Sequence, residues 1–134
     1  MNVELTLNGR ATTLELRGDE MLTEALDLRE TCRIGVCGAC TVLLDGEPVT
    51  GCLTLAATVA GREITTVEGL GEDDPVLRAF NDAHAFQCGW CTPGFVLTVK
   101  AMRSGDDIGE ALSGNLCRCG CYVKIEEAVR QCVS

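Results

Sequence analysis

The sequence contains only one histidine, few aromatic residues and no apolar run long enough to span a bilayer. The lack of such a run excludes membrane insertion through a transmembrane helix. The N-terminus, MNVELTLNGR, also lacks the basic region followed by an apolar core that marks a secretory signal peptide. We therefore expect a cytoplasmic protein.

Positively charged residues are also scarce. Eleven Lys and Arg residues stand against twenty Asp and Glu residues, which gives a formal net charge of −9, and no basic cluster interrupts the acidic balance. Because nucleic acids and anionic membranes attract basic surfaces, both are unfavourable partners for this chain. We interpret the acidity as a contribution to solubility.

Cysteine, in contrast, is abundant, with ten in 134 residues. Cytosolic thiols are kept reduced, so a cytosolic chain rich in cysteine is expected to bind metal or to use its thiols in catalysis rather than to form disulfides. Domains of roughly 60 residues bury only a modest share of their surface and depend on additional stabilisation. Metal centres would supply it here.

The first half of the sequence has the pattern of short strands. Apolar residues alternate on both sides of the Asn8–Gly9 and Asp45–Gly46 dipeptides, which favour two-residue hairpin turns. A short helix is expected over residues 20–28 and a last strand over residues 62–67. The predicted order is hairpin, helix, cysteine-rich loop, hairpin and strand.

The second half, from residue 69, changes to a helical period. Helices are expected over residues 76–85, 95–102, 106–112 and 124–133. The stretch GLGEDDP, which ends at Pro75, separates this half from the first. We predict an α+β fold with one domain over residues 1–70 and a second over residues 71–134.

Four cysteines in the first half have the spacing of a plant-type [2Fe-2S] centre. They are Cys32, Cys37, Cys40 and, after eleven further residues, Cys52. A single loop can wrap three thiolates around one cluster, and Gly35, Gly38 and Ala39 let backbone N–H groups approach the sulfur atoms. Zinc more often takes paired short spacings. A Rieske centre is excluded because it needs two histidines and His84 is the only one.

A second cysteine set lies in the helical half. The motifs QCGWCTPG and NLCRCGCY supply Cys88, Cys91, Cys117, Cys119 and Cys121. Thr92–Pro93 is typical of an N-cap followed by a proline in the first helical turn. The positive helix end beside Cys91 would stabilise either an anionic cluster or a reactive thiolate.

Three interpretations of this second set are possible: thiol exchange by Cys88 and Cys91, a zinc site, or a second [2Fe-2S] cluster. A thioredoxin-type site needs strands around its motif, whereas the flanking segments here have a helical period. Thiol exchange would also leave Cys117 and Cys119 unexplained. We favour the second cluster, with zinc as the alternative. Cys132 falls on the apolar face of the last helix, where we expect it to pack.

Taken together, CRIGVCGAC and QCGWCTPG…SGNLCRC resemble the small iron–sulfur subunit of molybdenum hydroxylases, the group that contains xanthine dehydrogenase, aldehyde oxidoreductase and aerobic carbon monoxide dehydrogenase. The resemblance covers almost the whole chain. It implies an N-terminal β-grasp, ferredoxin-like domain and a C-terminal four-helix domain, each with one [2Fe-2S] cluster. It also implies a large partner subunit that carries a molybdopterin-type cofactor and a medium subunit that binds FAD.

The resemblance also implies a role for individual residues. The outer cluster, which faces the flavin partner, would be bound by Cys32, Cys37, Cys40 and Cys52. The inner cluster, near the molybdenum cofactor, would be bound by Cys88, Cys91, Cys117 and Cys119. Gln87 would contact the pterin, and Cys119 would be the ligand closest to it.

Two features depart from the family pattern. The glycine-rich stretch that usually precedes the first cysteine is shortened here, so that LDLRE runs directly into Thr31 and Cys32. Cys121 stands where the family more often has glycine or threonine, and it is either a bystander or a substitute ligand. The first departure bears on the identity of the electron acceptor.

No nucleotide-binding glycine loop and no catalytic constellation is found in the sequence outside the cysteines. We therefore predict an electron-transfer subunit without a substrate site, which relays electrons from the molybdenum cofactor through both clusters to a flavin or another acceptor. One alternative is a free-standing ferredoxin-like carrier, which would need neither the helical half nor Gln87. Another is a zinc-stapled adaptor without a redox role.

Overall fold

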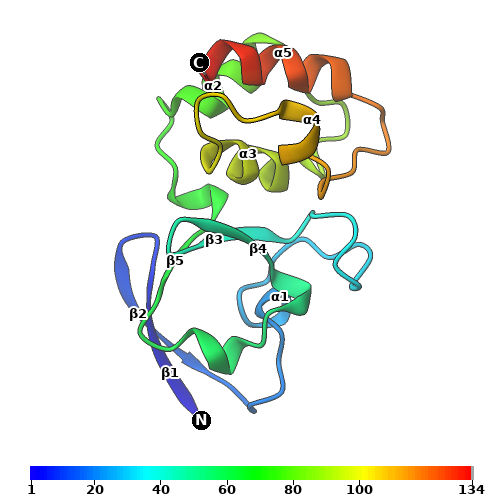
Figure 1. Cartoon of the computed structure of the whole chain (residues 1–134). Coiled ribbons are helices and arrows are strands. Elements are labelled where there is room, and N and C mark those ends of the chain that lie inside the picture. Colours follow the sequence, from blue (N-terminus) through cyan, green and yellow to red (C-terminus); the bar gives the residue numbers. More distant parts are fainter. Residues whose placement is uncertain (134) are drawn as a thin grey trace.

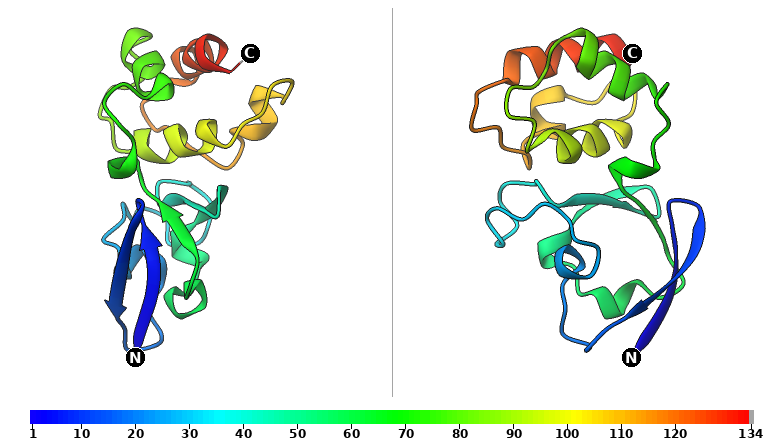
Figure 2. Two further views of the ribbon diagram at one scale, coloured as in Figure 1. Left: turned by 90° about the vertical axis from the view of Figure 1, so that its left-hand side faces the viewer. Right: turned by 180° about the vertical axis from the view of Figure 1, so that it is seen from behind.

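The sheet-forming half and the helical half of the molecule are stacked one on the other (Figure 1). This computed structural model describes residues 1–133. Figure 2 shows from two further directions that the helices lie over one end of the sheet half, with the two termini at opposite ends of the molecule. Each half has a hydrophobic core of its own. The α+β class predicted from the sequence is confirmed.

The first half is built on a mixed, five-stranded sheet in the order β2-β1-β5-β3-β4. The strands are β1 (Asn2–Leu7), β2 (Arg10–Glu15), β3 (Thr41–Leu44), β4 (Glu47–Thr50) and β5 (Glu63–Thr65). Both predicted hairpins are confirmed, because β1 pairs antiparallel with β2 and β3 pairs antiparallel with β4. Strand β5 runs parallel to β1 and antiparallel to β3, and so joins the two hairpins into one sheet.

Helix α1 (Leu22–Ala25) covers less of the chain than the helix expected over residues 20–28. Asp27 takes a left-handed backbone conformation with φ of 50°, which a continuing helix does not allow. The helix is nevertheless anchored, because Leu22 is fully buried in the core of the sheet half. Short 3₁₀ turns over Gly51–Leu53, Ala56–Val59 and Val67–Gly69 complete this half.

The second half contains the helices α2 (Pro75–Asp82), α3 (Thr92–Lys100), α4 (Ile108–Ala111) and α5 (Tyr122–Cys132). The side chain of Asp74 caps α2 by accepting a hydrogen bond from the N–H of Val76, and it also pairs with Lys100 at 2.6 Å. The prediction that Thr92 is the N-cap of the next helix is wrong. Helix α3 begins at Thr92, and Cys91 takes the N-cap position without a side-chain capping bond.

Helix α3 is the element that connects the two halves. It packs against β3 on one side and against α2 on the other, as the stacking in Figure 1 illustrates. Because it has neighbours on opposite sides, residues 94–99 of this helix are all buried. Within residues 1–133, no helix is both long enough and apolar enough to cross a membrane.

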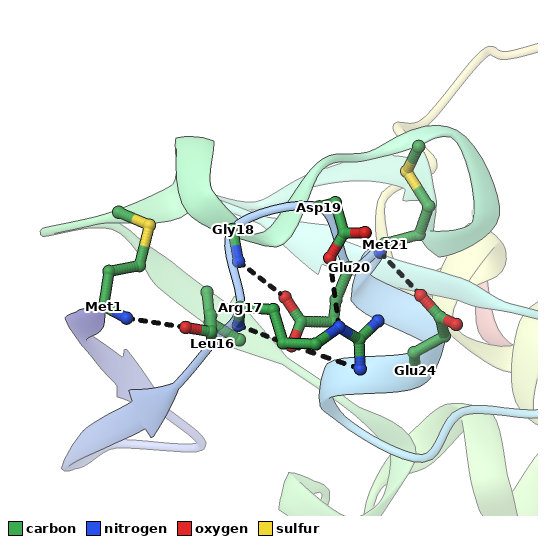
Figure 3. Close-up of polar contacts among 8 residues, drawn as sticks. All are labelled: Met1, Leu16, Arg17, Gly18, Asp19, Glu20, Met21 and Glu24. Atoms are coloured by element: carbon green, nitrogen blue, oxygen red, sulfur yellow. Dashed lines mark hydrogen bonds and ion pairs between the residues drawn. The ribbon is translucent and has the colours of Figure 1, made fainter.

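The carboxylate of Glu20 organises the loop between β2 and α1 (Figure 3). It accepts hydrogen bonds from the backbone N–H groups of Arg17 at 2.7 Å and Gly18 at 3.0 Å, and the residue is only 8% exposed. The bond from Arg17 contributes most to lowering the pKa of Glu20 to about 2. Just beyond it, the Glu24 carboxylate accepts the N–H of Met21 at 3.1 Å. Glu20 and Glu24 thus set the path of the chain into α1.

The Glu20→Gln variant should be less stable than the wild type at pH 7, because a neutral amide holds these two N–H groups more weakly. The pKa of Glu20 in the folded state lies below the ordinary value of 4.5, so its contribution is complete above that value and is lost as the pH falls toward about 2. Urea unfolding followed by circular dichroism should show a lower free energy of unfolding for the variant at pH 7, and this difference should become smaller at about pH 3.

Asp19→Asn is the matched control, because it removes only an exposed ion pair between Asp19 and Arg17. This control should unfold at the same urea concentration as the wild type. Equal losses of stability in both variants would contradict the role assigned to Glu20.

Candidate metal centres

The first predicted ligand set comes from two neighbouring segments of the sheet half. The loop between α1 and β3 carries Cys32, Cys37 and Cys40, and the turn after β4 carries Cys52. Backbone N–H groups point at the Sγ of Cys32 from Ile34 at 3.4 Å, Val36 at 3.3 Å and Cys37 at 3.4 Å. Several N–H groups directed at one sulfur are the arrangement that stabilises a thiolate.

The four thiols of this set influence one another. Backbone N–H groups that donate to its Sγ, with the largest effect from Ile34, lower the pKa of Cys32 to about 6. Burial raises the pKa of Cys52, and the thiols of Cys40 and Cys32 raise it further. The N–H of Cys52 in turn donates to the Sγ of Cys40 at 3.3 Å. Thiols that lie this close together do not all lose their protons unless a bound cation compensates the negative charge of the thiolates.

The second set comes from the turn before α3 and from the segment between α4 and α5. Burial raises the pKa of Cys91 to about 12, and the thiols of Cys117 and Cys88 add to this rise. Burial also acts to raise the pKa of Cys117, but hydrogen bonds to its Sγ outweigh burial, and the pKa is lowered. They come from the N–H of Cys121, at 3.4 Å, and from the thiol of Cys91. The turn and the segment therefore bring their thiols together.

Cys121 belongs to this group in space. It is buried at the N-cap of α5, where burial raises its pKa and the thiols of Cys117, Cys119 and Cys88 raise it further. The second set thus contains five thiols that influence one another in pairs, whereas a [2Fe-2S] cluster needs four. Cys132, at the other end of α5, packs against the helical core as predicted.

Gln87 and Cys119, the two residues expected to face a pterin, lie together. The Nε2 of Gln87 donates to the carbonyl oxygen of Cys119 at 3.4 Å, although the two residues are 32 positions apart in the sequence. Gln87 and the neighbouring Cys88 are exposed. This corner of the second set is therefore open to a partner molecule.

Thr92 provides a test of whether the second set suits a cluster. Its hydroxyl oxygen is buried and finds no hydrogen-bond partner among the described residues. An unpaired buried hydroxyl is costly, and Thr92 directly follows Cys91, so a cluster sulfur bound there would supply the missing acceptor. A set of thiolates surrounded by N–H donors is also the donor chemistry that [2Fe-2S] clusters use. The residues therefore fit this cofactor.

Nowhere in residues 1–133 do three His, Cys, Asp or Glu side chains converge as ligands of one ion. A [2Fe-2S] cluster shares its four thiolates between two iron atoms.

The Thr92→Val variant, which keeps the shape of the side chain, should lower the reduction potential of the second cluster. A hydrogen bond to sulfur favours the reduced, more negative state, and valine cannot donate one. A redox titration followed by EPR measures the potential of each cluster. The control is Thr58→Val, whose hydroxyl bonds the carbonyl oxygen of Leu55 at 2.6 Å in another part of the fold. The same potential in Thr92→Val as in the wild type would contradict the proposed bond.

Direct contacts between the halves link the two cysteine sets. The N–H of Leu116 donates to the carbonyl oxygen of Cys37 at 2.9 Å. The buried side chain of Asn115 donates to the carbonyl oxygen of Gly38 at 3.3 Å. Since Cys117 follows Leu116 in the chain, one hydrogen bond connects a residue of the first set with the neighbour of a residue of the second.

Two glycines make this close approach possible. A Cβ atom on Gly94 in α3 would lie 2.2 Å from the carbonyl oxygen of Gly38. A Cβ atom on Gly38 would lie 2.3 Å from the carbonyl oxygen of Gly114, and Gly38 has a φ of +72°. Without a side chain at Gly94, helix α3 can approach the first cysteine loop, and without one at Gly38 that loop can approach the segment at Gly114 that leads to Cys117.

The residues that hold the two sets together could not be recognised in the sequence. Asn115 contacts a residue 77 positions away, and Arg29 contacts residues 60 and 61 positions away. No local pattern marks such pairs. Only their position in the sequence could have pointed to them, because Asn115 lies just before Cys117 and Arg29 just before Cys32.

Two family models match the chain. The model of a 2Fe-2S iron-sulfur cluster binding domain matches residues 11–92, and the model of a [2Fe-2S] binding domain matches residues 66–130. Between them they include both cysteine sets.

The chain is similar along nearly its whole length to small subunits of known enzymes. It is 41% identical to the nicotinate dehydrogenase small FeS subunit of Eubacterium barkeri, over 99% of this chain and 95% of that protein. It is 42% identical to the nicotine 6-hydroxylase small subunit of Paenarthrobacter nicotinovorans, over 96% of this chain and 87% of that protein.

Solved structures share the fold. A chain of quinoline 2-oxidoreductase from Pseudomonas putida 86 matches with a TM-score of 0.89 and 37% identity, over 96% of this chain and 90% of that one. Aldehyde oxidoreductase from Desulfovibrio gigas matches with a TM-score of 0.91 and 31% identity, over 98% of this chain and 17% of that one.

Proposed function

Because the chain belongs to the family of small iron–sulfur subunits of molybdenum hydroxylases, we propose that it relays electrons between a molybdenum cofactor on a large partner subunit and a second acceptor. Its role as an electron-transfer subunit of an oxidoreductase follows from the family. The observation that carries the proposal is the hydrogen bond from the N–H of Leu116 to the carbonyl oxygen of Cys37, which links the two cysteine sets.

We assign one [2Fe-2S] cluster to each set. The first would be bound by Cys32, Cys37, Cys40 and Cys52, and the second by Cys88, Cys91, Cys117 and Cys119. The N–H groups directed at the sulfurs of Cys32, Cys40 and Cys117 support the assignment. When bound, each cluster supplies reversible one-electron chemistry, and the surrounding N–H groups, burial and charge adjust its potential.

We also assign a β-grasp, ferredoxin-like domain to residues 1–70 and a four-helix domain to residues 71–134, of which residue 134 lies outside the described part. The five-stranded sheet with α1 in its core supports the first assignment. For the second, the support is a core that α2, α3 and α5 share and against which α4 packs through Ile108.

The large subunit is proposed to dock over the second set. Apolar side chains that are 42–70% exposed surround this region: Phe86, Trp90, Leu116, Tyr122 and Val123. Exposed apolar patches of this kind are typical of protein contacts. Gln87 and Cys119 lie in the same region, and we propose that they face the pterin of the molybdenum cofactor.

The electron acceptor is proposed to dock over the first set, where Ile34, Val36 and Leu53 are 51–69% exposed. A medium subunit that binds FAD is the acceptor that the family pattern favours. Between the two surfaces, the hydrogen bond from the N–H of Leu116 to the carbonyl oxygen of Cys37 joins a residue of the first set to the neighbour of Cys117 at 2.9 Å.

Metal analysis combined with EPR tests the proposal. The reduced protein should contain iron and show two distinct [2Fe-2S] signals, and it should purify together with a large, molybdenum-containing subunit. Zinc without an iron signal would overturn the electron-transfer role. Two iron–sulfur signals in a protein that binds no large subunit would instead favour a free-standing ferredoxin-like carrier.

A further inference from the structure

Three residues outside the cysteine sets form a second connection between the two ligand loops. These residues, Arg29, Thr31 and Trp90, are called the clamp below. Nη1 of Arg29 donates to the carbonyl oxygens of Gly89 at 2.6 Å and Trp90 at 2.9 Å. The guanidinium carbon of Arg29 lies 4.9 Å from the centroid of the Trp90 ring, and Nε1 of Trp90 donates to Oγ1 of Thr31 at 2.8 Å.

The clamp is attached directly to residues assigned as cluster ligands. Gly89 and Trp90 are the two residues between Cys88 and Cys91, and Thr31 immediately precedes Cys32. The backbone N–H of Trp90 also donates to the Sγ of Cys88 at 3.4 Å. A movement of Trp90 would therefore move a ligand-bearing turn and an N–H donor to a ligand sulfur at the same time.

Neither hydrophobic core depends on the clamp. Trp90 is 48% exposed and belongs to neither core, and neither the half-buried Arg29 nor the exposed Thr31 is part of a core. The halves have separate contacts through Asn115 and Gly94. The clamp is thus an addition to the packing of the two halves, placed at the side where the cysteine loops meet.

The geometry of Arg29 is specific. A planar guanidinium can donate to two carbonyl oxygens while it stacks on an aromatic ring, whereas a lysine ammonium is a point charge without a plane that could stack. Through this group, the backbone of the turn that carries Cys88 and Cys91 is held against the segment that leads into Cys32.

We propose that Arg29, Thr31 and Trp90 are positioning residues for electron transfer between the two clusters. They hold the turn with Cys88 and Cys91 in one orientation relative to the loop that begins at Cys32, and so keep the separation and relative orientation of the clusters constant. The step itself moves one electron from one cluster to the other, with no bond formed or broken and no proton transferred. The inference rests on the proposed function, because it requires a cluster in each cysteine set.

The test compares the variants Arg29→Met, Arg29→Lys and Trp90→Ala in the complete complex. With both clusters reduced, their unpaired spins split each other's EPR signals to an extent that depends on distance and orientation. Arg29→Met and Trp90→Ala should keep both signals and the iron content but change this splitting, and turnover should fall about tenfold, as is typical when support for metal ligands is lost. In both the splitting and the turnover, Arg29→Lys should lie between Arg29→Met and the wild type.

Arg130→Ala is the matched control, because Arg130 pairs with Glu126 on the exposed side of α5 and should leave splitting and turnover unchanged. Wild-type splitting and turnover in Arg29→Met and Trp90→Ala would overturn the inference. If these variants lose iron, Thr31→Val decides, since it removes a single hydrogen bond: altered splitting supports the clamp, and unaltered splitting overturns it. A wild-type protein without two iron–sulfur signals would overturn the proposed function, and the clamp with it.

Discussion

Replacing Cys91 with serine should remove one of the two [2Fe-2S] EPR signals and stop turnover of the complex. Cys91 is a half-buried thiol that adjoins the thiols of Cys117 and Cys88, and iron–sulfur clusters are held by thiolates, which a serine hydroxyl does not replace. The other signal should persist, because the four ligands of the first set come from the sheet half. EPR of the reduced variant and its iron content, which should fall by about half, measure the effect.

The other cysteines of the helical half provide the controls. Cys132→Ser should retain both signals, because Cys132 packs at the far end of α5, away from the second set. Cys121→Ser separates the two roles open to that residue: retention of both signals makes it a bystander, and loss of the second signal makes it a ligand. If Cys91→Ser itself kept both signals, Cys91 would not be a ligand.

The Gly94→Ala variant should be strongly destabilised, although alanine is normally the better helix former. The new Cβ atom would lie 2.2 Å from the carbonyl oxygen of Gly38, and a backbone atom cannot move aside as a flexible side chain can. Helix α3 and the first cysteine loop would have to separate, which would also strain the hydrogen bond between Leu116 and Cys37. Overpacking of this kind costs about 1–3 kcal/mol, and we expect the upper part of that range. Thermal unfolding measures the loss.

Gly109→Ala is the matched control for this experiment. Gly109 also lies in a helix, α4, but a Cβ atom there would meet its nearest neighbour, an oxygen of Asp107, at 3.4 Å, an ordinary contact distance. This substitution should be neutral or stabilising by up to about 1 kcal/mol, since alanine restricts the unfolded chain more than glycine does. Similar losses in both variants would show that the contact between α3 and the first cysteine loop does not limit stability.

At two helix ends the structure differs from what the local sequence predicts. Thr92 has the character of an N-cap residue, yet its hydroxyl is buried without a hydrogen-bond partner among the described residues, and helix α3 begins one residue earlier than a threonine cap would allow. The helix expected over residues 20–28 ends at Ala25, because the chain turns at Asp27 on its way to the first cysteine loop. Propensity describes what a segment prefers in isolation, and it did not give the observed conformation at either place.

The sequence by itself determined the number and grouping of the cysteines, both β-hairpins, the change from strand to helix near residue 70 and the family. These features are encoded locally, in the spacing of thiols along one loop, in turn dipeptides and in apolar periodicity. Only the tertiary structure decided how the two cysteine sets meet, through Gly38 and Gly94, Asn115 and the clamp. These contacts join residues up to 77 positions apart, and they exist because α3 packs against the sheet half, a surface match that no local pattern records.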